Sequence, residues 1–280
     1  MSRSEREIEA MSRPEKPEIL LIHGMWSRPS FWDGWIERLT QAGYSCKAVA
    51  LRREDLYSGD VPLPEIGRLG IRDYVERIKL AVLQCHSPPI LIGHSLGGLL
   101  SQIVATEMKV AAVVLVNSAA PAAVFPMRPV MMPGLIRTMM RYGVWRQPFK
   151  LSSWEANYLF LNRLPEQDRS SIFQSLVFES GRVLFEAGLG KLNFRRTNLV
   201  DKAAIQCPML FLAGTEDRII PLSVSRRMAK WYGSKLTYRE YAGYSHWLLG
   251  EPGWQDILEH SLAWLERHVL KSSAEITTLS

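Results

Sequence analysis

One segment of the sequence reads Ile92-Gly93-His94-Ser95-Leu96-Gly97-Gly98. Its centre fits the pattern Gly-x-Ser-x-Gly, which is typical of a serine held on a tight turn between a strand and a helix. Because glycines lack side chains, the strand and the helix can approach closely around that turn. The segment therefore predicts that Ser95 projects from the carboxyl end of a strand.

The surrounding sequence predicts more strands of the same kind. Residues 89–93 form a short apolar run before Ser95, and residues 99–105 can form a helix after it. Similar apolar runs occupy residues 18–22, 46–51, 110–117 and 209–213, and a further strand-like run occupies residues 236–241. Such runs are typical of parallel strands buried on both faces. Amphipathic helix-length stretches separate them, as at 31–42 and 71–84, so we predict an α/β fold with a doubly wound, mostly parallel sheet.

The alternation divides the chain into parts. Residues 1–17 are polar and predict a mobile N-terminal arm. Residues 18–121 and 201–270 form the predicted α/β core, in which the amphipathic stretch 254–270 covers one face of the sheet. Residues 122–200 break the alternation and predict a helical cap, with helices expected at 131–142 and 153–163.

Composition limits the possible functions. The 280 residues are 47% hydrophobic and 22% charged, which is ordinary for a globular protein. The net charge is +6, but the basic residues are scattered, so we do not expect nucleic acid as a partner. The N-terminus opens with charges rather than an apolar signal core, and the sequence lacks an apolar run long enough to span a bilayer. We therefore expect a cytoplasmic protein.

Two residues that come later in the chain, an aspartate and a histidine, could activate the Ser95 hydroxyl. A serine hydroxyl is a poor nucleophile until an imidazole takes its proton, and a buried carboxylate holds that imidazole in the productive tautomer. Asp217 follows the strand predicted at 209–213, and His246 follows the strand predicted at 236–241. This chain order suits a serine, acid and histidine set. We predict Ser95, Asp217 and His246 as catalytic residues, with Glu216 as the alternative acid.

Acyl transfer also needs donors for the developing oxyanion, and backbone N–H groups can supply them. Leu96 follows the nucleophile and gives one donor. The second is expected from the loop after the first strand, His23-Gly24-Met25-Trp26, where we choose the N–H of Met25 over that of Trp26. The Trp26 side chain is predicted to form a wall of the substrate pocket, and His23 to organise the loop.

These motifs together resemble the α/β-hydrolase superfamily, from about residue 18 to residue 270. The resemblance is carried by residues 23–25, 93–98 and 214–217 and by His246. It is closest to the cofactor-free, esterase-like branch, whose cap follows the sixth strand of an eight-stranded sheet. The resemblance implies a triad of Ser95, Asp217 and His246 and no cofactor, and the sequence itself shows no metal-ligand cluster. Residues 50–56 depart from the Asp-x-Arg-Gly-His-Gly of many relatives, which weakens any assignment to a subfamily.

The resulting functional hypothesis is hydrolysis of a carboxylic ester or thioester through an acyl-serine intermediate. A hydrophobic small-molecule substrate with a large or apolar acyl group or an aromatic group is expected, because the predicted cap is rich in methionine and aromatic residues. Two alternatives stay open: the same triad could serve a C–C hydrolase, lyase or cyclase acting on a metabolite, or the protein could be a ligand sensor with little turnover. The basic, apolar stretch 131–150, with Arg137, Arg141 and Arg146, also allows contact with an anionic membrane surface.

Overall fold

The computed structural model describes residues 16–57, 59–140 and 143–270. Of the arm predicted for residues 1–17, only residues 16 and 17 belong to this part of the chain. Residues 141–142, at the end of one predicted helix, also lie outside it. Among the helices of the described part, none is both long and apolar enough to cross a membrane.

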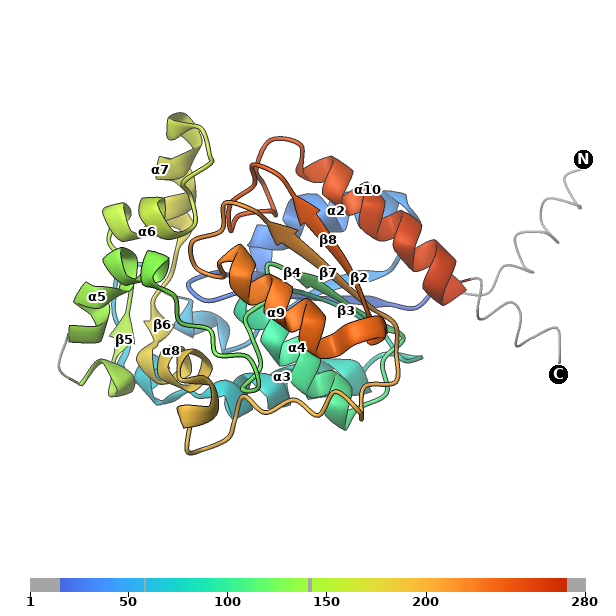
Figure 1. Ribbon diagram of the computed structural model, residues 1–280, viewed down its shortest axis with the longest axis horizontal. Helices are drawn as coiled ribbons and strands as arrows, with labels where there is room; N and C mark the ends of the chain where they lie inside the picture. The colour runs from blue at the N-terminus through green and yellow to red at the C-terminus, as the bar shows by residue number, and fades with distance from the viewer. Residues whose placement is uncertain (1–15, 58, 141–142, 271–280) are drawn as a thin grey trace, which may run out of the picture.

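A parallel sheet forms the centre of the molecule (Figure 1). Its strands are β1 (Ile19–Ile22), β2 (Cys46–Val49), β3 (Ile90–His94), β4 (Ala112–Val116), β7 (Met209–Gly214) and β8 (Leu236–Tyr241). They lie in the order β2-β1-β3-β4-β7-β8, and every neighbouring pair is parallel. The predicted doubly wound α/β fold is confirmed. The sheet of the described residues has six strands rather than eight, and each of the six coincides with a predicted strand.

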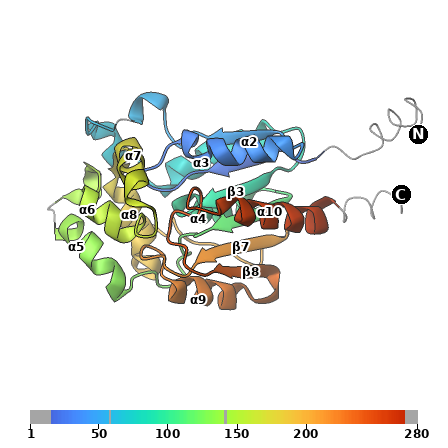
Figure 2. The same cartoon turned by 90° about the horizontal axis from the view of Figure 1, so that it is seen from above.

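Helices cover both faces of this sheet (Figures 1 and 2). On one face lie α3 (Ile71–Leu83), α4 (Leu96–Glu107) and α9 (Leu222–Tyr232), and on the other lie α2 (Asp33–Gln41) and α10 (Trp254–Leu265). Short 3-10 or π turns connect or extend these elements; they are η1 (Pro29–Trp32), η2 (Glu54–Leu56), η3 (Pro64–Arg68), η7 (Gly233–Lys235) and η8 (Glu266–Leu270). Alternate strand residues therefore face different helices, which explains why all residues of β1, β3, β4 and β7 are buried and nearly all of them are apolar.

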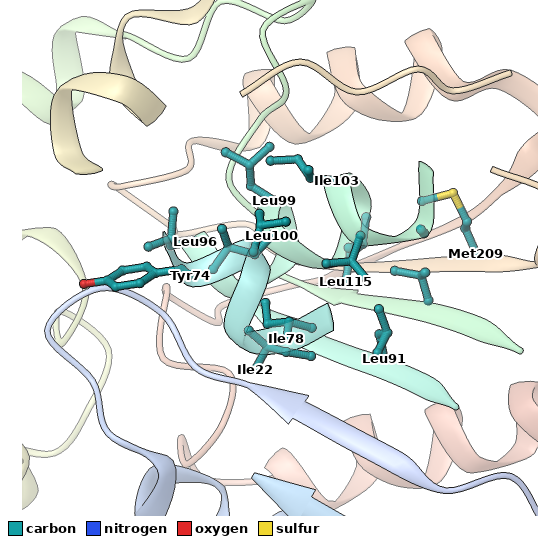
Figure 3. Close-up of a cluster of buried hydrophobic side chains, with 14 of the residues drawn as sticks. Ile22, Tyr74, Ile78, Leu91, Leu96, Leu99, Leu100, Ile103, Leu115 and Met209 are labelled. Carbon is teal, nitrogen blue, oxygen red and sulfur yellow. The ribbon is translucent and has the colours of Figure 1, made fainter. Parts of the chain in front are cut away.

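Helix α4 is the most deeply buried of these helices. Figure 3 shows its side chains Leu96, Leu99, Leu100 and Ile103 in one cluster with strand residues of the sheet. Residues 96–105 are all buried, so the helix has no polar outer face. Each large apolar side chain removed from water contributes about 1.5–3 kcal/mol, so this packing holds the turn at Ser95 firmly.

The 122–200 segment leaves the sheet after β4 and returns at β7. It contains α5 (Met132–Met140), α6 (Ser153–Leu159), α7 (Glu166–Ser175) and α8 (Gly181–Gly188), the turns η4 (Pro129–Met131), η5 (Val144–Arg146) and η6 (Gly190–Leu192), and a two-stranded antiparallel sheet of β5 (Pro148–Phe149) and β6 (Glu179–Ser180). The arrowheads of β7 and β8 point toward this group of helices (Figures 1 and 2). The segment thus lies beside the carboxyl ends of the strands.

The helices of the segment differ in part from those expected. Helix α6 begins where predicted, because Ser152 and Glu155 form a reciprocal capping box, but it ends at Leu159, after which Phe160 leaves the helical conformation (φ −139°). Helix α7 was not predicted. None of its residues is buried, so its sequence lacks the apolar period by which a helix is recognised.

A buried ion pair joins the 122–200 segment to the loop after β2. The Arg52 Nη1 group donates to Glu179 Oε1 of β6 at 3.0 Å, and Tyr74 donates to the same oxygen at 2.6 Å. Both charged side chains are almost completely buried. The pair therefore forms part of the contact between the segment and the sheet domain.

Candidate active site

The predicted site residues meet at the carboxyl edge of the sheet. Met25 and Trp26 follow β1, Ser95 follows β3 and His246 follows β8, and all four line one small pocket. Asp217 follows β7 and contacts His246 from behind. Parallel strands bring their following loops to one edge, which is where ligands bind in open α/β sheets.

Ser95 occupies a strained turn between β3 and α4. Its backbone has φ 54° and ψ −120°, outside the regions that ordinary residues favour. The chain packs tightly there: a Cβ on Gly97 would lie 2.1 Å from the carbonyl oxygen of Ile22, and a Cβ on Gly24 would lie 2.9 Å from the Cβ of Ser95. The glycines at these positions therefore allow the turn to form.

His246 and Asp217 form a buried hydrogen-bonded pair. The His246 Nδ1–H donates to Asp217 Oδ2 at 2.6 Å. The other carboxylate oxygen of Asp217 accepts the backbone N–H groups of Ile219 and Ile220, at 2.8 and 2.7 Å. Glu216, the alternative acid, is exposed. The pair leaves Nε2 of His246 as the nitrogen with a free lone pair, on the ring that lines the pocket with Ser95.

Two backbone N–H groups near Ser95 are available as donors. Leu96 is the first residue of α4, where an N–H has no acceptor within the helix. The N–H of Met25 donates no hydrogen bond within the described chain. The carbonyl of the next residue, Trp26, accepts the N–H of Val177 at 2.9 Å. That bond holds the loop after β1 against the 122–200 segment.

Comparison with known proteins identifies the fold family. The model of a family described as the alpha/beta hydrolase family matches residues 19–254. The chain belongs to this family. Solved structures similar to this alpha/beta hydrolase include a monoacylglycerol lipase from Paleococcus ferrophilus, at 22% identity and a TM-score of 0.62 over 91% of this chain and 96% of the other.

Two further structures have the same fold. A pyrethroid hydrolase from Sphingobium faniae JZ-2 is 18% identical, with a TM-score of 0.66 over 89% of this hydrolase and 96% of that chain. A methylesterase from Arabidopsis is 13% identical, with a TM-score of 0.67 over 90% of this hydrolase and 99% of that chain. At such identities the likeness establishes the fold.

Two residues of the hydrolase that the sequence did not single out hold the loop of His246. The His94 Nε2–H donates to the carbonyl oxygen of His246 at 2.9 Å. Asn117, at the end of β4, donates from Nδ2 to the carbonyl oxygens of Ser245 and His246 at 2.8 and 3.0 Å, and accepts the N–H of Gly214 at 2.8 Å. Asn117 thereby connects the strand leading to the acid with the loop of the histidine.

Two histidines beside the site, His94 and His23, are held neutral by burial. Burial lowers the pKa of His94 well below its ordinary value, and the neighbouring His246 lowers it further. Burial also lowers the pKa of His23 to about 3. His23 donates from Nδ1 to the carbonyl of Gly24 at 2.9 Å and accepts the Tyr57 hydroxyl at Nε2, at 2.8 Å. Its neutral form satisfies both ring nitrogens, in keeping with a loop-organising role.

A second buried carboxylate lies behind His246. Glu251 accepts the N–H of Ser245 at 3.0 Å and a hydrogen bond from the hydroxyl of the same serine. Burial raises the pKa of Glu251, and the charge of Asp217 raises it further. Glu251 thus fixes the residue before His246. The sequence gives no local pattern from which this contact could be predicted.

The pocket of this hydrolase is closed by aromatic side chains. Trp26 and Phe160 stack with ring centres 6.4 Å apart, and Trp247 lies 6.3 Å from Phe160. The cavity over Ser95 has a volume of about 10 Å³, room for about one water molecule. Ser95 itself is 8% exposed. Substrate entry therefore requires Trp26, Phe160 or Trp247 to move.

The side chains that line the pocket include hydroxyl and imidazole groups. Within residues 16–57, 59–140 and 143–270, no group of three or more histidine, cysteine, aspartate or glutamate side chains is arranged to hold a metal ion. The pocket lining offers two serine hydroxyls, of Ser27 and Ser95, and two imidazoles, of His94 and His246. This set suits proton transfer and nucleophilic attack.

Proposed function

We propose that this alpha/beta hydrolase cleaves a carboxylic ester or thioester through an acyl-Ser95 intermediate. The observation that carries the proposal is the buried Asp217–His246 hydrogen bond next to a serine on a strained turn. The oriented imidazole can act as a general base, which the serine needs.

The reaction would run in two halves. His246 Nε2 takes the proton of the Ser95 hydroxyl as Oγ attacks the substrate carbonyl carbon. The N–H groups of Leu96 and Met25 stabilise the resulting oxyanion. His246 then gives the proton to the leaving alcohol or thiol, and the C–O or C–S bond breaks. Water attacks the acyl-serine in the same way, which releases the acid and restores Ser95.

An apolar acyl or aromatic substrate group fits the pocket lining. Trp26, Phe160 and Trp247 face Ser95 from the core and from the 122–200 segment. Lipase, pyrethroid hydrolase and methylesterase, the names of the three similar structures, denote ester-cleaving enzymes, which supports the proposed reaction class. We expect p-nitrophenyl esters with longer acyl chains to react faster than the acetate. An acetate that reacts faster than every longer ester would contradict this substrate class.

Active-site labelling tests the nucleophile. A fluorophosphonate probe should modify the folded wild-type protein and should fail to modify Ser95→Ala, whose ester hydrolysis should fall by about a thousandfold or more. Ser171→Ala, on the exposed surface of α7, is the matched control and should label like the wild type. Folded wild-type protein that resists the probe, or Ser95→Ala that still labels, would overturn the proposal.

A further inference from the structure

Two adjoining grooves lie on the 122–200 segment and its border with α9, away from Ser95. The first has a volume of about 700 Å³ and is lined by Phe125, Leu192 and Trp231 with Lys191, Arg227 and Lys230. The second has a volume of about 580 Å³ and includes Trp145, Leu189 and Phe194 with Arg68, Arg146 and Arg195. Leu192 lines both grooves, so they form one continuous surface. We call this surface the basic apolar face.

The basic apolar face exposes large apolar side chains. Phe194 is 96% exposed, Leu192 59%, Phe125 47% and Trp145 43%. Contiguous exposed apolar surface of this kind marks an interaction site, because a soluble monomer gains nothing from leaving it in water. Aromatic side chains are also enriched where proteins meet the interface of a bilayer.

The charge around these side chains has one sign. The 122–200 segment carries eleven arginine and lysine residues against five carboxylates, whereas the rest of the chain carries equal numbers of each. The net charge of +6 thus resides in this segment. Among the described residues that line the two grooves, Glu186 is the single acidic one, and it is buried and paired with Arg182 at 2.7 Å.

We infer that the basic apolar face docks on an anionic lipid bilayer. Arginine and lysine side chains next to an anionic membrane are attracted to its surface, and apolar side chains between them can enter the headgroup region. A small soluble anion would satisfy the cations but would leave Phe194 and Leu192 in water. The sequence suggested membrane contact through residues 131–150. Of the three arginines named there, Arg146 lines the second groove, Arg137 lines neither groove, and Arg141 lies outside the described residues.

Vesicle co-sedimentation of the full chain tests this inference. The wild type should bind vesicles of phosphatidylcholine with about one-third phosphatidylserine at low salt, and salt should weaken the binding. The double variant Lys191→Glu with Phe194→Glu should bind about tenfold or more weakly. Lys109→Glu with Leu83→Glu changes the charge by the same amount at exposed positions on the core, and should bind like the wild type.

Three outcomes would overturn the inference. One is a wild type that stays in the supernatant with the anionic vesicles at low salt. Another is equal loss of binding in the two double variants, since charge alone would then explain it. The last is a change of oligomeric state in the Lys191→Glu, Phe194→Glu variant, measured by sedimentation velocity, because the face would then join copies of the chain. Hydrolysis of a soluble ester serves as the folding check for both variants.

Discussion

At the scale of single residues, Asn117 connects the parts of the site that carry the acid and the histidine. Its Nδ2 group faces two carbonyl oxygens, of Ser245 and His246. Asn117→Asp would place a carboxylate oxygen against them while keeping the size of the side chain. We expect kcat to fall by about a hundredfold with a smaller change in KM, because misplacing a catalytic group by about 1 Å has such an effect.

Steady-state kinetics on a p-nitrophenyl ester measures this change. Gln206→Glu is a matched control, since Gln206 also donates from its amide to a carbonyl oxygen, that of Ala203, but on the exposed surface. Unchanged kcat in Asn117→Asp would show that the loop of His246 keeps its place without these bonds.

The buried neutral His23 makes the stability of the folded protein depend on pH. The folded protein holds His23 neutral down to a pKa of about 3, whereas the unfolded chain takes up the proton near the ordinary value of 6.5. Acid therefore favours the unfolded state, and the stability from this residue is lost as the pH falls below 6.5. Below about pH 6 the free energy of unfolding of the wild type should fall more steeply than that of His23→Gln, by roughly 1 kcal/mol per pH unit.

Urea denaturation between about pH 6 and 5 measures the two slopes. His86→Gln, at an exposed position, should keep the slope of the wild type. Identical slopes for the wild type and His23→Gln would mean that His23 takes up its proton in the folded state.

The site residues proposed from the sequence have a recognisable position along the chain, whereas the residues that support them are defined by contacts that form only in the folded protein. Ser95, Asp217 and His246 follow predicted strands in a fixed chain order, which a sequence displays. His94 and Asn117 act through hydrogen bonds to a loop more than a hundred positions away in the chain. Such contacts leave no local pattern, because any polar side chain at the end of a strand has the same appearance in sequence.

At the scale of elements, the crossing of α4 over β1 depends on Gly97. A methyl group there would lie 2.1 Å from a backbone oxygen, which cannot rotate away. We expect Gly97→Ala to lower the free energy of unfolding by about 3 kcal/mol or more, as overpacking against backbone does. Gly188→Ala is the matched control: it lies in α8, where the new Cβ would meet no atom within 4 Å beyond its chain neighbours and the backbone of its own helix, and it should stabilise the helix by up to about 1 kcal/mol.

Thermal denaturation followed by circular dichroism compares these two variants. A Gly97→Ala protein as stable as the wild type would mean that β1 and α4 can separate without loss of packing.

Helices and strands could be predicted where their buried residues form an apolar run or recur at a regular spacing in the sequence. Strands β1, β3, β4 and β7 are buried along their whole length, so each was visible as an apolar run, whereas β2 and β8 carry exposed polar residues. Helix α9 was not singled out, although Pro221 precedes it and Val224 and Met228 recur at helical spacing on its buried face. Strands β5 and β6 are only two residues long, which is too short for any period to show.

At the scale of the whole molecule, the Arg52–Glu179 pair links the 122–200 segment to the core. Removing one partner of a buried pair leaves an uncompensated charge, so Arg52→Met should destabilise the protein by about 3–5 kcal/mol. Arg226→Met, which breaks the exposed pair with Glu240, should change stability by less than about 1 kcal/mol. Adding Glu179→Gln to Arg52→Met removes the stranded charge and should restore part of the loss.

Urea denaturation at neutral pH compares the three variants. If Arg52→Met proved no more destabilising than Arg226→Met, the ion pair would not hold the segment in place. The sequence did not reveal this pair, because the two residues are far apart in the chain and each is an ordinary charged residue when read alone.

The closed cavity over Ser95 has a consequence for how ligands are recognised. A space of about 10 Å³ cannot hold an ester, so substrates and inhibitors bind a conformation in which Trp26, Phe160 or Trp247 has turned aside. Every apparent affinity is then weakened by the fraction of molecules in that open conformation. A substitution that favours opening would tighten the binding of chemically unrelated ligands by one common factor, without adding a contact to any of them.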